Sequence, residues 1–324
     1  MDQEATILRK GVGGFSPPKI LICDEMHEDG LDILRRNSMK VDYRPTIDYE
    51  SLLNSIENYD CVVVRSKTRI TAEVIRRAKN LKLIARAGSG VENIDLEEAR
   101  VSGVKVVRCP EAVASSVAEL TIALMITLSR KLDKAIECTR RGLWRREELI
   151  GLELAGKTLG IVGVGNVGAR VARIASRLGM KLLLNDLRRI SLDEYEMAEQ
   201  TDLDTLLGES DFVSIHLPLN RETRGMIDRE RLELMKRSAY LINTSRPEII
   251  DLKALYKALK DKWIAGIAMD ATGEWLKENA ELLKFDNFLC TPHIGAQTRE
   301  ARRRASIRIA ERIVEELRGI KPTN

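Results

Sequence analysis

The sequence predicts an α/β protein with two flavodoxin- or Rossmann-like domains, each built around a parallel sheet. Two observations lead to this prediction. Short apolar runs alternate with amphipathic helical runs along most of the chain, which is the pattern of βαβ units. One such unit, residues 158–186, has a glycine-rich turn between its strand and its helix. The length of 324 residues exceeds that of most single domains and fits two.

The composition supports full cores and argues against polyanionic partners. Hydrophobic residues make up 44% of the chain but aromatic residues only 4%, so we expect mostly aliphatic cores. The chain has 53 basic and 49 acidic side chains, which are spread without a long basic arm. We therefore expect no nucleic-acid partner. The densest basic cluster, residues 299–304, is expected to be an exposed helix face.

Cysteine usage predicts a cytoplasmic protein without a metal site. The five cysteines show no CxxC or metal-ligand spacing, and several lie in apolar runs, which suits reduced thiols: Cys23, Cys61, Cys109, Cys138 and Cys290. We find no signal peptide and no long apolar segment, so no membrane is expected. Residues 1–18 are expected to form a flexible N-terminal tail.

The first domain is predicted to span residues 19–109 together with 293–324. Its strands are expected at 19–23, 41–43, 61–64, 81–85 and 104–107, and its helices at 30–36, 49–57, 71–78 and 95–101. In such parallel sheets ligands bind at the carboxyl ends of the strands. Arg65, Ser66 and the loop 88–90 lie at such ends. A final amphipathic helix, 298–317, is expected to return to this domain.

The second domain is predicted to span residues 110–292. It opens with a long helix over 115–141, whose apolar face suits a link between domains or a contact between subunits. After the glycine-rich unit, we expect helices near 203–207, 230–235 and 251–259. Strands are expected at 212–216, 239–243, 264–270 and 288–291.

The glycine-rich unit predicts a dinucleotide site. Gly163 lets the chain turn out of its strand, Gly165 lets a pyrophosphate approach the backbone, and Gly168 lets helix and strand pack closely. The start of the helix offers unpaired N–H groups and the positive end of its dipole to the phosphates. The same turn contains two further candidate contacts, Asn166 and Val167.

An acidic residue after the second strand predicts NAD as the cofactor. Asp186 follows Gly168 at the distance where a carboxylate bonds both ribose hydroxyls. Its charge would oppose the 2′-phosphate of NADP. Arg188 and Arg189 follow directly and leave NADP open, although they also suit a solvated strand end.

Seven segments in a fixed order resemble the D-2-hydroxyacid dehydrogenase family, and within it most of all the short form of the phosphoglycerate dehydrogenases. They are VRSKTRIT (64–71), RAGSGVENID (86–95), PEAVASSVAE (110–119), LAGKTLGIVGVGNVG (154–168), HLPLNRET (216–223), INTSRPEIID (242–251) and TPHIGAQT (291–298). The resemblance implies an active-site cleft between the two domains. It also implies hydride exchange between a nicotinamide and the carbon that bears a hydroxyl or oxo group. We expect no regulatory domain of the kind seen in longer relatives after Asn324.

The resemblance assigns roles to individual residues. His293 matches the catalytic histidine, although on residue type alone a structural histidine is equally plausible. Arg246 matches the arginine that orients the substrate. The loop Ser89, Gly90 and Val91 matches the cradle of the substrate carboxylate. Further cofactor contacts are expected at His216, Pro218, Thr223, Thr244, Gly295 and Asp270, the last near the nicotinamide carboxamide.

Two positions depart from the family pattern. Pro247 replaces the glycine that normally follows the arginine, so the next helix must begin differently. The glutamate that normally pairs with the histidine is expected where Trp275 stands, with Glu274 one residue earlier. Either Gly273 lets the loop shift so that Glu274 becomes the catalytic partner, or the pair is missing. We favour Glu274.

The predicted reaction is oxidation of D-3-phosphoglycerate to 3-phosphohydroxypyruvate in serine biosynthesis. Arg65 lies in the segment that meets the substrate phosphate in phosphoglycerate dehydrogenases, although it also suits a strand-end ion pair. Two alternatives remain: a glyoxylate or hydroxypyruvate reductase, and a regulatory relative that binds NAD with little catalysis. We expect a small-molecule substrate and a homodimer through the nucleotide domains.

Overall fold

The computed structural model describes residues 16–319, and the chain divides into two compact units. Unit 1 comprises Met1–Ala112 and Arg302–Asn324, and unit 2 comprises Val113–Ala301. Both boundaries fall inside long helices, α5 (Pro110–Arg130) and α12 (Arg299–Gly319), which therefore belong to both units. The domain boundaries expected at residues 110 and 293 stay predictions, as do the expected roles of the two domains. The expected tail lies largely outside the described residues.

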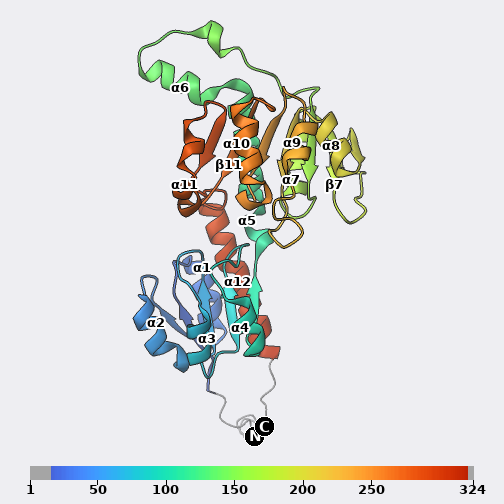
Figure 1. Ribbon diagram of the computed structural model, residues 1–324. Coiled ribbons are helices and arrows are strands. Elements are labelled where there is room, and N and C mark those ends of the chain that lie inside the picture. Colours follow the sequence, from blue (N-terminus) through green and yellow to red (C-terminus); the bar gives the residue numbers. More distant parts are fainter. Residues whose placement is uncertain (1–15, 320–324) are drawn as a thin grey trace, which may run out of the picture. The chain divides into compact units, whose positions relative to one another are not determined.

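Unit 1 is a five-stranded parallel sheet in the order β2-β1-β3-β4-β5 (Figure 1). Its strands are β1 (Lys19–Ile22), β2 (Lys40–Tyr43), β3 (Cys61–Val64), β4 (Leu83–Arg86) and β5 (Lys105–Arg108). Its helices are α1 (Glu28–Arg36), α2 (Tyr49–Ser55), α3 (Ala72–Arg77) and α4 (Leu96–Val101). The helices α2, α3 and α4 begin after Asp48, Thr71 and Asp95, whose side-chain oxygens accept backbone N–H groups of the first turn.

The last described helix, α12, completes unit 1, as expected from its amphipathic pattern. Its buried face contains Ala305, Ile309 and Ile313. The approach to α1 is so close that a Cβ on Gly30 would lie 2.5 Å from the carbonyl oxygen of Ser306. The basic cluster 299–304 is more than a solvated face, because Arg302 and Arg303 form ion pairs with Glu25 and Asp29 of unit 1.

Unit 2 is a seven-stranded parallel sheet in the order β12-β11-β10-β9-β6-β7-β8. Its strands are β6 (Thr158–Val162), β7 (Lys181–Asn185), β8 (Ala198–Gln200), β9 (Phe212–Ile215), β10 (Tyr240–Asn243), β11 (Gly266–Asp270) and β12 (Phe288–Thr291). Its other helices are α6 (Leu132–Arg140), α7 (Gly168–Arg177), α8 (Leu203–Glu209), α9 (Arg229–Leu234), α10 (Leu252–Lys260) and α11 (Gly273–Glu278).

Two apolar clusters pack the faces of this sheet. One joins α5 and α7 to the strands through Ile122, Met125 and Val171, and the other joins α8, α9 and α10 through Leu206, Leu232 and Leu255. Among residues 16–319, α5 alone is long and apolar enough to span a membrane by length and composition. Its apolar residues lie in the core instead, against Leu159 and Ile161 in the same cluster.

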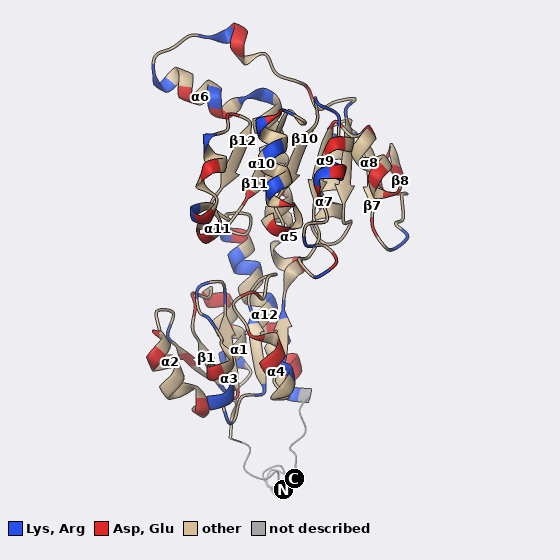
Figure 2. Cartoon of the chain, in the orientation of Figure 1, with Lys and Arg blue, Asp and Glu red and all other residues tan. Residues whose placement is uncertain are grey.

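The long helix expected over 115–141 is in fact two helices. The first begins at Pro110, because a proline at the first helical position loses no hydrogen bond and presets φ. It ends where Lys131 adopts φ 52°, and α6 begins at the next residue. In Figure 1, α6 and the segment after it extend away from the sheet of unit 2. Figure 2 marks basic and acidic residues, which are interspersed along the helices of both units.

Candidate functional site

The glycine-rich turn of unit 2 has the backbone geometry that the sequence predicted. Gly163 adopts φ 91°, which favours glycine, and its N–H donates to the carbonyl of Asn185 (2.8 Å). A Cβ on Gly168 would overlap the carbonyl oxygen of Gly163. A Cβ on Gly165 would meet no protein atom within 4 Å, so its missing side chain serves neither packing nor the turn. That open space beside the start of α7 fits the approach of a pyrophosphate.

Asp186 follows β7 and is already engaged by the protein. Its Oδ2 accepts the N–H of Val164 (2.9 Å), which ties it to the glycine-rich turn. Its Oδ1 accepts the backbone N–H and the Nε of Arg188 (3.0 and 3.2 Å). Partial burial raises the pKa of Asp186, but hydrogen bonds from Arg188 and Val164 hold it below its usual value overall. The carboxylate is therefore charged and fixed beside the glycine-rich turn, and its expected contact with a ribose stays a prediction.

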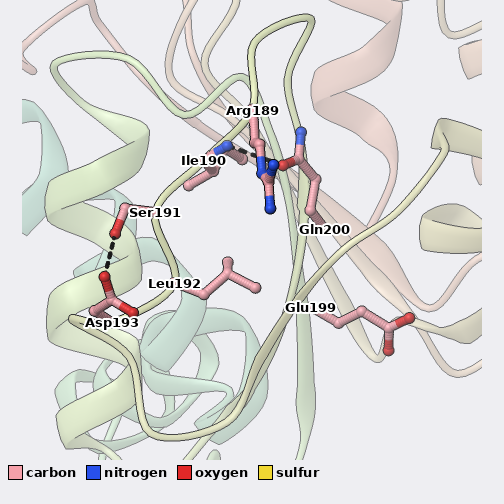
Figure 3. A pocket seen from close by; sticks show the side chains of 7 residues that line it. All are labelled: Arg189, Ile190, Ser191, Leu192, Asp193, Glu199 and Gln200. Carbon is pink, nitrogen blue, oxygen red and sulfur yellow. Dashed lines mark hydrogen bonds between the residues drawn. The ribbon is translucent and has the colours of Figure 1, made fainter.

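The loop after Asp186 is held by Gln200 of β8, a residue that the sequence analysis did not single out. Its Oε1 accepts the N–H of Ile190 (2.9 Å), and its Nε2 donates to the carbonyl of Arg188 (2.8 Å). Figure 3 shows Gln200 beside Arg189 and Ile190 in a pocket of about 500 Å³. Because Gln200 bonds the backbone of Arg188 and Ile190, the position of Arg188 depends on the edge strand β8.

His216 lies at the end of β9 and is neutral. Its Nε2 is 2.7 Å from the Oγ of Ser214, and its backbone N–H donates to Val162. Burial lowers the pKa of His216 to about 3. In the following loop, the Oγ1 of Thr223 donates to the carbonyl of Pro218 (2.6 Å), which stabilises the turn after the strand.

The end of β10 fixes the backbone around Arg246. The Nδ2 of Asn243 donates to the carbonyl of Arg246 (2.8 Å), and the Oγ1 of Thr244 is 2.8 Å from that of Thr121. Pro247 is the first residue of a short 3₁₀ helix, Pro247–Ile249. A proline there loses no hydrogen bond, so the departure from the family glycine is accommodated without strain.

His293 lies in the turn after β12 and adopts φ 54°. Asp270, at the end of β11, is only 4% exposed and accepts three hydrogen bonds from this turn. The donors are Thr291 Oγ1 (2.6 Å), Ile294 N (2.9 Å) and Gly295 N (2.8 Å). The cofactor contacts expected at Asp270 and Gly295 stay predictions, and the structure adds a contact between these two residues.

The displaced glutamate lies on α11. Thr272 accepts the N–H of Trp275 (3.3 Å) and so starts the helix. Trp275 packs against the main apolar cluster of unit 2, whereas Glu274 is exposed on the first turn. The family position is thus filled by a partly buried apolar side chain, and the pairing of Glu274 with His293 stays a prediction.

In unit 1, the segment after β3 is organised by a buried carboxylate. Asp24 accepts the backbone N–H of Arg65 (2.5 Å) and the Oγ1 of Thr68 (2.8 Å). Asn93 donates to the carbonyls of Arg65 and Thr68 (2.9 and 2.6 Å). Arg65 is half-buried, while Ser66 is exposed. The arginine is therefore held in one backbone position.

Arg86, the last residue of β4, is a functional candidate that the sequence analysis missed. Its Nη1 donates to the carbonyl of Ala87 (2.9 Å), while its Nε is buried without a hydrogen-bond partner among the described residues. Burial lowers the pKa of Arg86, and Arg65 lowers it further, although Glu92 opposes this. Arg302 likewise lowers the pKa of Arg65, after burial as the main cause. Arg65 is thus repelled by both Arg86 and Arg302.

The loop next to Arg86 is the predicted carboxylate cradle. Gly88 adopts φ 151°, and the side chain of Arg86 occupies the space where its Cβ would lie. Ser89 is exposed, and its carbonyl accepts from Arg108 (3.1 Å). Gly90 and Val91 are half-buried. A charge at the end of an apolar strand, directly before this loop, was the signal that could have identified Arg86.

Comparison with known proteins finds the same architecture. Residues 122–295 match the family model described as D-isomer specific 2-hydroxyacid dehydrogenase, NAD binding domain. The chain is 41% identical over 310 residues to D-3-phosphoglycerate dehydrogenase of Methanocaldococcus jannaschii, covering 93% of this chain and 58% of that protein. It is 42% identical over 277 residues to hydroxypyruvate reductase of Thermotoga maritima, covering 84% of this chain and 89% of that one.

A solved structure shows the fold match. The TT0316 protein from Thermus thermophilus superposes with a TM-score of 0.83 at 35% identity, covering 94% of this chain and 99% of that chain. The chain spans 58% of the length of the two archaeal phosphoglycerate dehydrogenases that it matches.

Proposed function

The chain belongs to the D-isomer specific 2-hydroxyacid dehydrogenase family, and from this premise we propose that it oxidises a phosphorylated D-2-hydroxy acid with NAD. The proposed reaction converts D-3-phosphoglycerate to 3-phosphohydroxypyruvate. The NAD-binding domain is part of the family match, and the open space at Gly165 and the charged Asp186 fit the cofactor. NAD supplies the hydride acceptor when it is bound.

The observation that carries the choice of substrate is the arginine cluster of unit 1, defined as Arg65, Arg86 and Arg302. The Nε of Arg86 is buried without a partner among residues 16–319, which is costly unless a ligand satisfies it. Glu25 pairs with Arg302 and so neutralises part of the charge. A dianionic phosphate would balance the two remaining positive charges, whereas a hydroxy acid without a phosphate would leave them unbalanced.

The chemistry falls to two residues of unit 2. We expect His293 to take the proton of the substrate hydroxyl, which leaves the carbon free to give up a hydride. The guanidinium of Arg246 suits the carboxylate and the developing carbonyl oxygen, because its planar fork can donate two bonds at once. Asn243 fixes the backbone from which that arginine extends. The proposal therefore assigns proton transfer and substrate orientation to unit 2 and recognition of the phosphate to unit 1.

The test is NADH formation with two substrates that differ only in the phosphate, D-3-phosphoglycerate and D-glycerate. We expect kcat/KM to be at least about 100-fold higher for the phosphorylated acid, the size of one or two charged hydrogen bonds. Equal values, or a preference for glyoxylate or hydroxypyruvate in the reverse direction, would favour the reductase alternative, which the 42% identity to a hydroxypyruvate reductase keeps open. NAD binding without turnover of any acid would favour a regulatory role.

Two variants test the assignment of roles. His293→Ala should lower kcat by about 10²–10⁴-fold while NAD still binds. Glu274→Gln should lower kcat less, through the orientation of the imidazole. If Glu274→Gln turns over like the wild type, the proposed pairing is wrong and the exposed position of Glu274 is its final one.

We also propose a homodimer formed through the arm of unit 2, defined as residues 131–152. Helix α6 in this arm has no buried residue. Several large apolar side chains of the arm are exposed, which is costly in a monomer: Leu132, Ile136, Leu143, Trp144, Ile150 and Leu152. Sedimentation velocity should show a dimer, and Trp144→Glu together with Ile136→Glu should shift it to a monomer. A wild-type monomer at micromolar concentration would contradict this proposal.

A further inference from the structure

The turn that carries His293 has an unusual backbone for its residue type. His293 adopts φ 54°, in the left-handed region that residues other than glycine rarely occupy. Such a conformation persists only where the surroundings determine it. The turn follows β12 directly, and the N–H of His293 donates to the carbonyl of Thr291 (3.0 Å). One such local bond does not determine the conformation, so contacts from outside the turn must help to fix it.

One carboxylate supplies most of what the turn needs. Asp270 ends β11 and lies in register with Thr291, which ends β12. Its Oδ1 accepts the Oγ1 of Thr291 and the N–H of Ile294, and its Oδ2 accepts the N–H of Gly295. These bonds hold the residues on both sides of His293. Because Asp270 is 4% exposed, water does not compete effectively for them.

The far end of the turn is clamped from the other side. The carbonyl of Gly295 accepts the Oγ of Ser116 in a buried bond of 2.6 Å. A Cβ on Gly295 would lie 3.0 Å from Asp270 Oδ2 and 3.3 Å from Val117 Cγ2. The glycine therefore fits between α5 and the carboxylate, and the peptide after His293 has little room to move.

We propose that Asp270 is a positioning residue, which holds the backbone of His293 in its left-handed conformation and thereby aims the imidazole. This inference rests on the proposed role of His293 as the proton acceptor. It goes beyond a contact between Asp270 and the cofactor, because both carboxylate oxygens already accept donors of the turn. A catalytic group displaced by about 1 Å loses on the order of 10²-fold in rate.

Two substitutions test the proposal by kinetics. In Asp270→Asn an amide NH₂ takes the place of one carboxylate oxygen. It lies either opposite the N–H of Gly295 or opposite the donors of Thr291 and Ile294, so at least one donor loses its acceptor and faces another donor. In Thr291→Val one of the three bonds is lost. We expect kcat to fall on the order of 100-fold and 10-fold respectively, while the Kd for NAD changes less than about threefold.

The matched control is Asp202→Asn. Asp202 also accepts a backbone N–H and a side-chain hydroxyl in unit 2, from Thr205 (2.9 and 2.7 Å), but at the exposed start of α8. Its kcat should stay at the wild-type value. If Asp270→Asn weakens NAD binding by the same factor as it lowers kcat/KM, or if Thr291→Val keeps full kcat, the positioning role is refuted.

A second measurement does not depend on turnover. The chain has three histidines, so ¹⁵N-histidine labelling gives three imidazole signals, from His27, His216 and His293. We expect Asp270→Asn and Thr291→Val to shift or broaden the signals of His293 and to leave those of His27 unchanged. Unchanged His293 signals in both folded variants would overturn the inference even if the enzyme is active. If the wild type oxidises no hydroxy acid but the His293 signals shift, the proposed function fails and the positioning role stands.

Discussion

At the carboxyl ends of β3 and β4, unit 1 presents arginine side chains, whereas at the carboxyl end of β6 unit 2 presents glycines. Both sheets are parallel throughout, so both units offer the same edge to a ligand. Unit 1 offers the side-chain charge of Arg65 and Arg86. Unit 2 offers the backbone at the start of α7, beside which Gly165 leaves open space.

The difference teaches how each unit tolerates change. A side-chain site loses one contact at a time when residues are replaced, and the sheet beneath is unaffected. A backbone site depends on residues that also determine the turn, so replacement affects folding and binding together unless a position serves binding alone. Gly165 is such a position, because no protein atom lies near its absent Cβ.

The largest effect is expected where the backbone site and the fold coincide. In Gly168→Ala the new methyl group overlaps the carbonyl of Gly163, so unfolding free energy should fall by about 3 kcal/mol, the upper end for overpacking. In Gly165→Ala stability should be retained, while NAD affinity falls on the order of tenfold or more because the methyl group occupies the pyrophosphate space. Urea unfolding and NAD titration measure both. Equal stability of the two variants would contradict the contrast.

A smaller effect is expected when the side-chain site of unit 1 loses one arginine. Arg86→Met removes the buried guanidinium but keeps its apolar bulk, so KM for D-3-phosphoglycerate should rise about 10–100-fold with NAD affinity unchanged. The matched control is Arg76→Met on α3, whose guanidinium pairs with Glu98 on the surface. If both variants behave alike, the arginine cluster is not the phosphate site.

The units also differ in a half-buried histidine of unit 2, His216, which predicts acid sensitivity there. His216 has its pKa lowered to about 3 in the folded chain, against about 6.5 when unfolded. Its contribution to stability is complete above pH 6.5 and is lost as the pH falls toward 3, because the unfolded chain binds the proton first. Between pH 7 and 5 the loss is about 2 kcal/mol.

Replacing His216 should therefore flatten the pH dependence. His216→Gln should lose about 2 kcal/mol less than the wild type between pH 7 and 5, by urea unfolding at both values. Absolute stability also falls at pH 7 because the bond to Ser214 changes, so the slope is the quantity to compare. An unchanged slope, with His27→Gln as the reference, would show that folding does not lower the pKa of His216.

The smallest effect concerns the choice of cofactor. Arg188 is mostly exposed, and exposed ion pairs contribute little. Arg188→Ala should leave the Kd for NAD within about threefold but weaken NADP further, by up to about fivefold, because a cation near the 2′-position is lost. Arg177→Ala, which breaks a similar pair with Glu196, is the control. A larger loss for NAD than for NADP would contradict this role.

Much of the fold followed from apolar runs, and the exceptions have physical causes. The three-residue strand Ala198–Gln200 contains no apolar run, because it is a sheet edge at which no residue of the strand is fully buried. The boundary between α5 and α6 at Lys131 is not marked by a glycine or proline, because a lysine adopts the left-handed φ of 52° there. Tertiary packing, which residue type does not encode locally, selects that conformation.

The candidate site was predictable where a residue acts through its own chemistry. The roles of Gly163 and Gly168 in the turn are confirmed by the backbone and the close packing. Arg86 was missed, because a charge at a strand end is usually solvated. The bonds of Asp270 were beyond prediction, since they depend on the adjacent ends of β11 and β12 and on a left-handed histidine.

Helix α12 comes last in the described chain, and most of it belongs to unit 1. This sets the order in which the two units can complete their folds. Ribosomes deliver a chain from its amino end, and residues 113–301 form one continuous stretch, so unit 2 has its whole sequence before unit 1 does. The core of unit 1 is complete only when Ala305, Ile309 and Ile313 of α12 have been synthesised. We therefore expect the unit that begins first in translation to complete its fold last.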